Sequence, residues 1–365
     1  MPTSPRRPAG KLLALVIVVA SVLLTLSAPA SEAGPSHRRS SAPPAPIPDY
    51  NLPADKAPSL RSKYEVLSAL VRPSVAQPVV QGAPTLTLDD TENILVLGID
   101  YRAGGKMWRT DTIMIVAVDQ IERKVGIISI PRDLWVDIPG YGEGRINIAD
   151  FYGEQTGYPG GGPALVGKIV GDHFKISVHH WVRVQQEALV RLVDRLGGVQ
   201  VTLDCPLLEK TPHPDIRGEY EYLRLPAGEN WLDGETAKKF ATFRYATTDF
   251  NRSRRQQQLI WAIRQRVEQI DVMLLVPELW NDLYDMFQTD LTLLDMFRYA
   301  ALGTQLQPED VRGLTLPRTT LAGKLVQGNQ VLVVSDPAAL QEALDNLFAA
   351  RPLADLGRSV TGQCR

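Results

Sequence analysis

The chain has 365 residues, of which 44% are hydrophobic, so it can bury the core of one large domain or two ordinary ones. Its formal net charge of −2 provides no overall positive field to attract nucleic acid, so any basic site must come from the placement of particular residues. The two cysteines, Cys205 and Cys364, lack metal-ligand spacing; they could pair in an exported domain or remain two unrelated thiols.

The N-terminal segment predicts export. Basic residues up to Lys11 precede an uncharged stretch, residues 12–31, which as a helix is just long enough to cross a bilayer core of about 30 Å. The basic flank predicts a cytoplasmic N-terminus, a single span and an extracytoplasmic remainder at the cell membrane. Ala28-Pro29-Ala30 is similar to a signal-peptide cleavage site, so residues 1–31 could be either an anchor or a cleaved signal peptide.

Residues 32–90 are predicted to form a linker. Ten of the 27 prolines lie between Pro35 and Pro84. A proline-rich segment is extended and semi-rigid and cannot bury a core, so it would hold a domain away from the membrane.

From residue 91 the pattern changes to alternating strands and helices. Continuous apolar runs predict strands at 93–99, 112–118 and 125–130, and further strands near 178–184, 199–203 and 331–334. Apolar spacing and capping residues predict helices at 185–196, 233–243, 252–270, after Thr292 and after Asp336. Elements interleaved in this way predict an α/β, three-layer α-β-α sandwich with a central mixed sheet. We expect one domain over 91–350, followed by a C-terminal tail, 351–365.

Arginines and aspartates recur where the predicted strands end. The sequence has Asp100 and Arg102 after the first strand, Arg109 and Asp111 before the second, Arg132 and Asp133 after the third, and a dense stretch from Arg244 to Gln257. Strand ends in an α/β sheet converge on a ligand crevice. Arginines match phosphate oxygens bidentately, and two carboxylates can hold Mg²⁺, so the pattern indicates a pyrophosphate site. Solvated surface ion pairs are the alternative interpretation of any single Arg-Asp pair.

The same residues carry a family resemblance. The motifs, in chain order, are residues 93–102, Arg109-Thr110-Asp111-Thr112, Ser129-Ile130-Pro131-Arg132-Asp133, Arg145-Ile146-Asn147-Ile148-Ala149, residues 225–237, and Arg244 with residues 249–257. This ordered series resembles the LytR-CpsA-Psr family of extracytoplasmic, membrane-linked phosphotransferases that attach glycopolymers to the bacterial cell wall. Asn251, where the family often has glycine, and residues 245–247 depart from its pattern and leave the identity of the polymer open.

The resemblance implies a reaction and a role for each residue. A glycopolymer phosphate would pass from a polyprenyl-pyrophosphate-linked donor to a hydroxyl of a wall glycan, peptidoglycan, with pyrophosphate hydrolysis as a side activity. Asp100 and Asp111 would bind Mg²⁺. The pyrophosphate would contact Arg102, Arg109, Arg132, Arg244, Arg252, Arg255 and Gln256. Arg132, Arg244 and Asp249 would be catalytic, Asp249 by orienting arginines or assisting proton removal. The lipid would occupy an apolar tunnel whose lining the sequence does not identify.

Two other functions are open to test. A non-catalytic extracytoplasmic module could bind anionic wall polymer or polyprenyl phosphate; such a module needs the arginines but gains nothing from Asp100 and Asp111. Transcriptional regulation is disfavoured, because the chain has no helix-turn-helix pattern and is predicted to be exported, so we expect no nucleic-acid partner.

Other conspicuous residues are predicted to be structural. His179-His180 lies in an apolar strand, and adjacent strand residues face opposite sides, so a metal pair is not expected. Gly160-Gly161-Gly162 lacks the Lys-Ser/Thr of a phosphate-binding loop and is predicted to be an ordinary loop. Asp215 and residues 219–221 are predicted to be solvated loop charges.

Overall fold

In a computed structural model of the protein, the structure describes residues 86–101, 107–212, 219–243, 249–270, 286–303 and 305–355. The predicted membrane segment, most of the predicted linker, Arg102, Arg244, Asp215 and Cys364 lie outside these residues. Within the described ranges, every helix is too short or too polar to cross a membrane.

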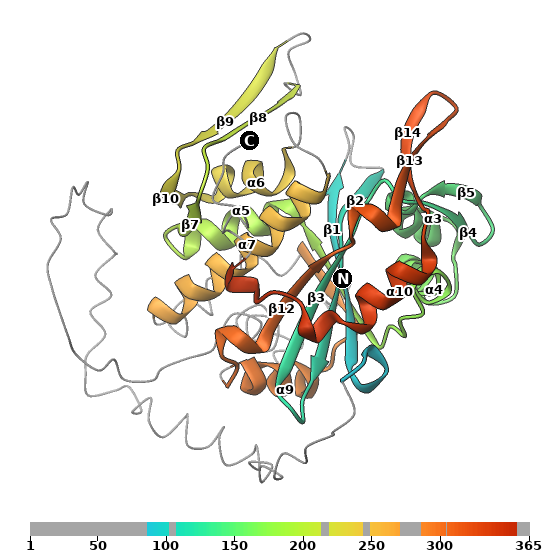
Figure 1. Ribbon diagram of the computed structural model, residues 1–365, viewed down its shortest axis with the longest axis horizontal. Helices are drawn as coiled ribbons and strands as arrows, with labels where there is room; N and C mark the ends of the chain where they lie inside the picture. The colour runs from blue at the N-terminus through green and yellow to red at the C-terminus, as the bar shows by residue number, and fades with distance from the viewer. Residues whose placement is uncertain are drawn as a thin grey trace, which may run out of the picture.

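A six-stranded mixed sheet forms the centre of the fold, in the order β11-β6-β1-β2-β3-β12 (Figure 1). Its strands are β1 (Glu92–Tyr101), β2 (Trp108–Asp119), β3 (Lys124–Ile130), β6 (His180–Gln185), β11 (Phe287–Thr289) and β12 (Val311–Thr315). β2 runs antiparallel to its two neighbours, β1 and β3, whereas β6 is parallel to β1 and β12 is parallel to β3. The predicted α/β fold with a central mixed sheet is therefore confirmed.

Helices cover both faces of this sheet. On one face lie α3 (Ala149–Thr156), α4 (Gly161–Phe174) and α10 (Pro337–Asp345), and their apolar residues share a core with Leu95, Ile113 and Ile128. On the other face lie α9 (Leu293–Gly303) and part of α7 (Asp249–Gln269), which pack near Ile94, Met114 and Ile127. Because both faces are buried, the strands are continuous apolar runs without polar alternation.

A second core lies beside the sheet and shares α7 with it (Figure 1). It contains α5 (Gln186–Arg195), α6 (Gly234–Thr242), the β7 (Val199–Leu203) and β10 (Gly228–Leu232) ribbon, and the base of the β8 (Leu207–Pro212) and β9 (Tyr220–Leu225) hairpin. Leu259, Ile263 and Val267 of α7 point into this core, whereas Ile260 and Trp261 pack against the sheet. α7 therefore connects the two halves of the fold.

The predicted helix caps form. The Asp233 carboxylate accepts from the Thr236 amide at 2.8 Å, and Asp336 accepts from the Ala339 amide at 3.0 Å. At the start of α9 the capping box is reciprocal, with Thr292 N to Asp295 Oδ2 at 3.0 Å and Asp295 N to Thr292 Oγ1 at 3.2 Å.

Two predicted loops are wrong in part. α4 begins at Gly161, so Gly161 and Gly162 form its first turn. A Cβ on Gly162 would lie 2.0 Å from the Asp150 carbonyl oxygen, so the glycine permits a close approach of α4 to α3. Glu221 belongs to strand β9, and its carboxylate lies 3.3 Å from Lys239 Nζ. It is therefore an ion-paired strand residue and not a solvated loop charge.

Two-stranded ribbons complete the described part of the chain. β4 (Trp135–Ile138) pairs with β5 (Gly142–Arg145), and β13 (Leu321–Val326) pairs with β14 (Asn329–Val334). The strands predicted at 199–203 and 331–334 therefore form, but each belongs to a separate ribbon. His179 Nδ1 accepts from the Asn93 backbone amide at 2.9 Å, so this histidine contacts the sheet backbone. This agrees with the prediction that His179 is structural.

Candidate active site

A bulge in β2 sets the position of Asp111. Gly98 of β1 lies opposite Thr112, whereas the next residue, Ile99, lies opposite Thr110. Asp111 is therefore an extra residue with no Cα partner on β1. A bulge bends its strand and redirects side chains, and bulges are common beside active sites.

The bulge also switches the face that β2 presents. Before the bulge in the chain, Trp108 Nε1 donates to Asp150 Oδ2 of α3 at 2.7 Å; after it, Thr112 Oγ1 accepts from Gln256 of α7 at 2.9 Å. Trp108 and Thr112 are four positions apart, so a regular strand would place both on one face. The irregularity lets one strand end contact helices on both sides of the sheet.

A row of alternating charges crosses the ends of β2 and β3. Arg132 Nη1 lies 2.6 Å from Asp111 Oδ1, and Arg132 Nε lies 4.0 Å from Asp133 Oδ2. Arg145 Nε lies 3.6 Å from Asp133 Oδ1. The Asp111 and Arg132 side chains retain only 11% and 16% of their exposure, so this row is largely shielded from water. The structure thus brings together two residues that the sequence predicted for the site, Asp111 and Arg132.

Asp100 and Arg109 are cross-strand neighbours on β1 and β2. Asp100 is half-buried and Arg109 is exposed. Since side chains alternate along a strand, Asp100 shares a face with Gly98, the residue opposite the bulge. Two carboxylates on adjacent strand ends suit Mg²⁺, which usually binds one or two protein carboxylates together with substrate phosphates and water. No cluster of three or more His, Cys, Asp or Glu side chains with metal-binding geometry occurs within the described ranges, so an all-protein metal cage is not seen there.

The N-terminal half of α7 supplies buried polar residues. Arg252 is 2% exposed and Gln256 is 8% exposed, and they lie four positions apart on one side of the helix. The contact of Gln256 with Thr112 places this side next to the bulge that bears Asp111. Asp249 is the first residue of α7; its side chain lies outside the description, as does Arg244.

Arg255 contacts the protein through all three guanidinium nitrogens. Nε donates to the Phe240 carbonyl at 2.7 Å, Nη2 donates to the Phe243 carbonyl, and Nη1 lies 3.3 Å from Glu209 Oε1. Both Arg255 and Glu209 are buried. These contacts fix the C-terminal end of α6, directly before Arg244. The contact of Arg255 with pyrophosphate stays a prediction. Its contacts in the structure favour a role in positioning the end of α6.

Gln257 attaches α7 to the sheet. Its Nε2 lies 2.8 Å from Ser129 Oγ, 3.3 Å from the Ile127 carbonyl oxygen and 3.2 Å from the Leu314 carbonyl oxygen. The side chain is fully buried. The Arg-Gln-Gln end of the predicted signature therefore holds α7 against α6 and the sheet.

Sequence reasoning missed a buried charge network behind β2. Arg183 Nη2 lies 2.5 Å from Asp150 Oδ1 and 2.7 Å from Glu154 Oε1, and its guanidinium lies 5.6 Å from the Trp108 ring centroid. Burial raises the pKa of Asp150, against the opposing effect of Arg183. Burial also lowers the pKa of Arg183, but the carboxylates of Asp150 and Glu154 outweigh it and raise that pKa overall. An arginine inside an otherwise apolar strand was the available signal, because a buried charge requires a partner.

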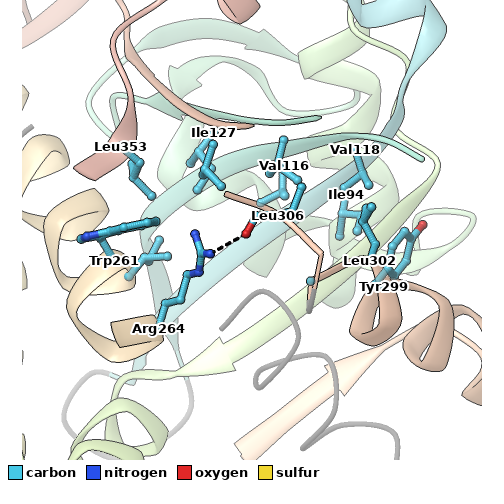
Figure 2. Close-up of a pocket in the computed structure, with 14 residues that line it drawn as sticks. Ile94, Val116, Val118, Ile127, Trp261, Arg264, Tyr299, Leu302, Leu306 and Leu353 are labelled. Carbon is cyan, nitrogen blue, oxygen red and sulfur yellow. Dashed lines mark hydrogen bonds between the residues drawn. The ribbon is translucent and has the colours of Figure 1, made fainter. Parts of the chain in front are cut away.

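An apolar cavity of about 40 Å³ lies between the sheet and helices α7 and α9 (Figure 2). Its walls include Ile94, Val116 and Ile127 of the sheet and Trp261 of α7. Among the described residues of this wall Arg264 alone is charged, and its Nη2 donates to the Leu306 carbonyl at 3.0 Å. Burial lowers the pKa of Arg264. The cavity suits an apolar ligand but is much too small for a long polyprenyl chain.

Cys205 is disulfide-bonded. The predicted partner, Cys364, lies outside the described residues.

Comparisons with known proteins agree with the fold and motifs. A sequence model of the LytR_cpsA_psr family matches residues 67–347. The chain is 30% identical over 255 residues to a protein of Oceanobacillus iheyensis named polyisoprenyl-teichoic acid–peptidoglycan teichoic acid transferase TagU, covering 68% of this chain and 72% of that protein. It is 30% identical over 230 residues to the regulatory protein MsrR of Staphylococcus aureus (strain COL), covering 63% of this chain and 65% of that protein, just under two thirds.

A solved structure, that of B. subtilis TagT, is similar in fold. Its TM-score is 0.52 at 25% sequence identity, and the similarity covers 76% of this chain and 94% of that chain. Sequence motifs, sheet topology and these matches lead to one conclusion: the chain belongs to the LytR_cpsA_psr family.

Proposed function

We propose that this protein transfers a glycopolymer phosphate from a polyprenyl-pyrophosphate-linked donor to a hydroxyl of peptidoglycan. The observation that carries the proposal is the shielded row Asp111-Arg132-Asp133-Arg145 at the strand ends, beside the buried polar side of α7. Arginine forks recognise phosphate oxygens and keep their charge at every physiological pH. The name of the TagU relative, a teichoic acid transferase, supports a wall polymer as the transferred group.

The reaction is a phosphoryl transfer in which atoms and charges balance. The acceptor oxygen bonds to the distal phosphorus while the bridging P–O bond breaks, and polyprenyl phosphate leaves with the bond's electron pair. Arg132 stabilises negative charge on the transferring group, and positioning of the two substrates supplies much of the remaining rate. Asp249 orients arginines or accepts the hydroxyl proton. Water in place of the sugar would give pyrophosphate hydrolysis.

Asp100 and Asp111 are our proposed ligands for Mg²⁺. Bound Mg²⁺ would neutralise charge on the phosphate oxygens. Because Asp111 already balances Arg132, these two charges would have to exchange partners in the loaded site, Arg132 toward phosphate and Asp111 toward the cation. The residual exposure of both side chains leaves them reachable from solvent.

The apolar cavity beneath α7 is the proposed start of the lipid site. Its walls are apolar except for Arg264 and Tyr299, which suits a hydrocarbon chain. Since its volume is only about 40 Å³, entry of the lipid requires α9 or the Trp261 side chain to move outward. Lipid binding should therefore be slower than diffusion.

We also propose that the domain works outside the cytoplasm, attached to the cell membrane by residues 12–31. The uncharged N-terminal segment and its basic flank support this location. The disulfide at Cys205 supports it as well, since disulfides persist mainly in oxidising compartments.

A transfer assay tests the proposal. Full-length protein in detergent would receive a polyprenyl-pyrophosphate-linked teichoic acid donor labelled with ³²P in the distal phosphate, together with purified peptidoglycan. We expect label in the sedimented wall and equimolar release of polyprenyl phosphate, both abolished by a Mg²⁺ chelator. Donor binding without release of polyprenyl phosphate would instead establish the non-catalytic binding module.

A further inference from the structure

A polar groove of about 370 Å³ runs between the β7–β10 ribbon and the C-terminal half of α7, apart from the charged row described above. Its volume falls within the range of about 300–1,000 Å³ that is typical of ligand sites, although its walls are far more polar than usual. Its polar lining residues are Gln200, Thr202, Asp204, Glu229, Gln258, Gln265, Arg266 and Gln269.

Three glutamines form one wall as a stripe on α7. Gln258, Gln265 and Gln269 are spaced by seven and four positions, so they lie on one side of the helix. With a rise of 1.5 Å per residue, this stripe is roughly 16 Å long. Gln256 and Gln257 turn toward the sheet instead, so the glutamine-rich stretch serves two surfaces.

The facing wall comes from the outer side of the ribbon. Thr202 of β7 pairs with Glu229 of β10, and Gln200 lies two residues before Thr202 on the same side. Within the described part of the chain, no side-chain hydrogen bond engages the stripe glutamines or these three ribbon residues. Each glutamine amide offers both a donor and an acceptor, so the groove presents paired hydrogen-bonding groups on two sides.

The charge of the groove argues against a polyanion. Glu229 contributes one negative charge and Arg266 one positive charge, so these two residues give the groove no net positive charge. The Arg266 guanidinium donates through Nε to the Leu196 carbonyl at 2.8 Å and lies 5.1 Å from the Trp231 ring centroid. A phosphate-rich polymer would gain no net electrostatic attraction here, whereas a neutral ligand rich in hydroxyl and amide groups needs none.

Trp261 gives the groove an apolar wall. Trp261 and Leu353 line both this groove and the apolar cavity of Figure 2, so these two side chains lie between the two spaces. The Arg264 guanidinium lies 4.5 Å from the Trp261 ring centroid, so part of the indole is already in contact with protein. The remaining aromatic surface, combined with amides and carboxylates, suits a sugar, whose C–H groups pack on the indole while its hydroxyls bond to the polar side chains. We propose that this groove binds a neutral glycan bearing hydroxyl and acetamide groups. The inference goes beyond the transfer reaction, because binding is measurable without a donor.

The test is calorimetric titration of the full-length protein in detergent with chitotetraose, a neutral oligomer of N-acetylglucosamine. We expect saturable binding that the double variant Gln265→Ala/Gln269→Ala weakens at least roughly tenfold, as the loss of two or three hydrogen bonds would. A second double variant on the ribbon, Gln200→Ala/Thr202→Ala, should weaken binding similarly. Gln155→Ala, an exposed glutamine of α3, is the matched control and should bind as the parent does.

The outcomes are distinct from those of the transfer assay. Absence of chitotetraose binding by the parent protein overturns the proposal even if transfer occurs, as does equal binding by all variants. Tighter binding of the polyanion polygalacturonate at the same groove, lost in the same variants, would also overturn it, because a neutral ligand would then not be preferred. Thermal melts of each variant confirm that these exposed positions leave the fold intact.

Discussion

Arg132 at the end of β3 and Asp111 in the bulge of β2 form an ion pair of 2.6 Å, and this contact joins the two strand ends that carry the proposed site. A charge-assisted contact of this kind holds both side chains in fixed positions before any substrate arrives. It also means that Asp111 has two possible roles, as a ligand for Mg²⁺ and as the counter-charge of Arg132.

The variant Asp111→Asn distinguishes a Mg²⁺ ligand from a counter-charge of Arg132 when the transfer rate is measured at increasing Mg²⁺ concentration. The amide keeps the shape but loses the charge, so we expect transfer to fall by roughly 10²-fold or more, by analogy with loss of one preorganised electrostatic group. If Asp111 binds the cation, the Mg²⁺ concentration for half-maximal rate should rise. An unchanged Mg²⁺ dependence would leave Asp111 as the partner of Arg132 alone. Asp137→Asn, an exposed carboxylate of β4, is the matched control.

Arg132→Lys tests the guanidinium itself. Lysine keeps the charge but loses the planar fork, so one or two charge-assisted hydrogen bonds to phosphate should be lost, at roughly 1.5–3 kcal/mol each before compensation. We expect weaker donor binding and slower transfer with an unchanged melting temperature. Donor binding equal to that of the parent would remove Arg132 from the pyrophosphate site.

Glu209→Gln distinguishes positioning by Arg255 from direct phosphate binding. Glu209 is buried against Arg255, so losing its charge should destabilise the fold by roughly 1–3 kcal/mol and disturb the end of α6. If Arg255 positions the segment before Arg244, Glu209→Gln and Arg255→Lys should lower stability and transfer together. If Arg255 also binds pyrophosphate, Arg255→Lys should weaken donor binding well beyond the effect of Glu209→Gln. Urea unfolding and donor titration measure the two effects.

The buried network behind β2 predicts that substitutions at Arg183 and Asp150 have non-additive effects on stability. Arg183→Met leaves the Asp150 carboxylate buried without its main partner and should cost roughly 3–5 kcal/mol in unfolding free energy. Adding Asp150→Asn should recover part of that loss, because no buried charge then remains uncompensated there. A double-mutant cycle by urea unfolding measures the coupling. Additive losses would show that the two side chains do not share an interaction.

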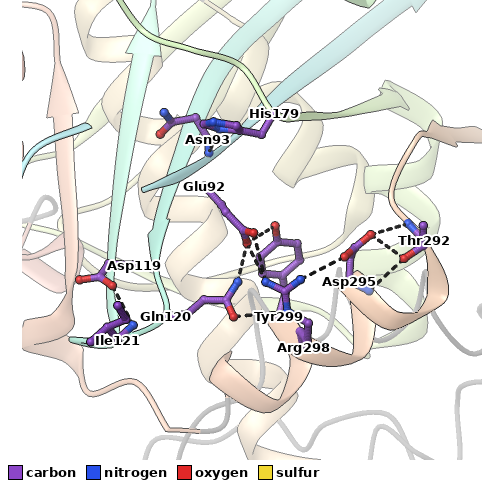
Figure 3. A network of polar contacts seen from close by, with 10 residues as sticks. All are labelled: Glu92, Asn93, Asp119, Gln120, Ile121, His179, Thr292, Asp295, Arg298 and Tyr299. Atoms are coloured by element: carbon purple, nitrogen blue, oxygen red, sulfur yellow. Dashed lines mark hydrogen bonds and ion pairs between the residues drawn. The ribbon is translucent and has the colours of Figure 1, made fainter. Parts of the chain in front are cut away.

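Glu92 predicts a pH-dependent contribution to stability at the opposite end of the sheet. Its carboxylate accepts from Tyr299 Oη at 2.8 Å and from Arg298 Nη2 at 3.1 Å, which fastens α9 to β1 (Figure 3). Burial raises the pKa of Glu92. Hydrogen bonds from Tyr299 and Arg298 and the charge of Arg298 together lower it by more, so the net pKa lies below the ordinary 4.5.

A lowered pKa means that this contribution is complete above pH 4.5 and disappears as the pH falls through the folded-state pKa. Both partners are partly exposed, so Glu92→Gln should cost only about 0.5–1 kcal/mol at neutral pH. The difference between parent and variant should vanish in acid. A difference in unfolding free energy that persists unchanged to pH 3 would contradict this account.

The sequence predicted the elements whose patterns are unambiguous. β1, β2 and β3 are apolar runs buried on both faces, and the caps at Asp233 and Asp336 are local signals that need no tertiary contact. β12 was not predicted, because its five residues include Arg312 and Gly313 and gain their strand geometry from pairing with β3. The β8–β9 hairpin was missed because β8 reverses the usual pattern: Leu208 is exposed and Glu209 is buried.

The site was predictable where chemistry follows strand ends. Asp111 and Arg132 each stand at a predicted strand boundary, and adjacent strands bring them together. The bulge was not predictable, because an extra residue appears only in the pairing register. The contacts of Arg255 were not predictable either, since its partners Glu209 and Phe240 come from elements whose packing against α7 no local pattern specifies.

The central claim is that the donor pyrophosphate binds beside Arg132 and Asp111. The most direct measurement is a crystal structure of the full-length protein with a non-reactive methylene-bridged analogue of the polyprenyl-pyrophosphate donor and Mg²⁺. We predict density for the two phosphorus atoms within contact of Arg132, a cation at Asp111, and hydrocarbon in the cavity beside Trp261. Density for the phosphorus atoms at any other place in the fold would contradict the claim.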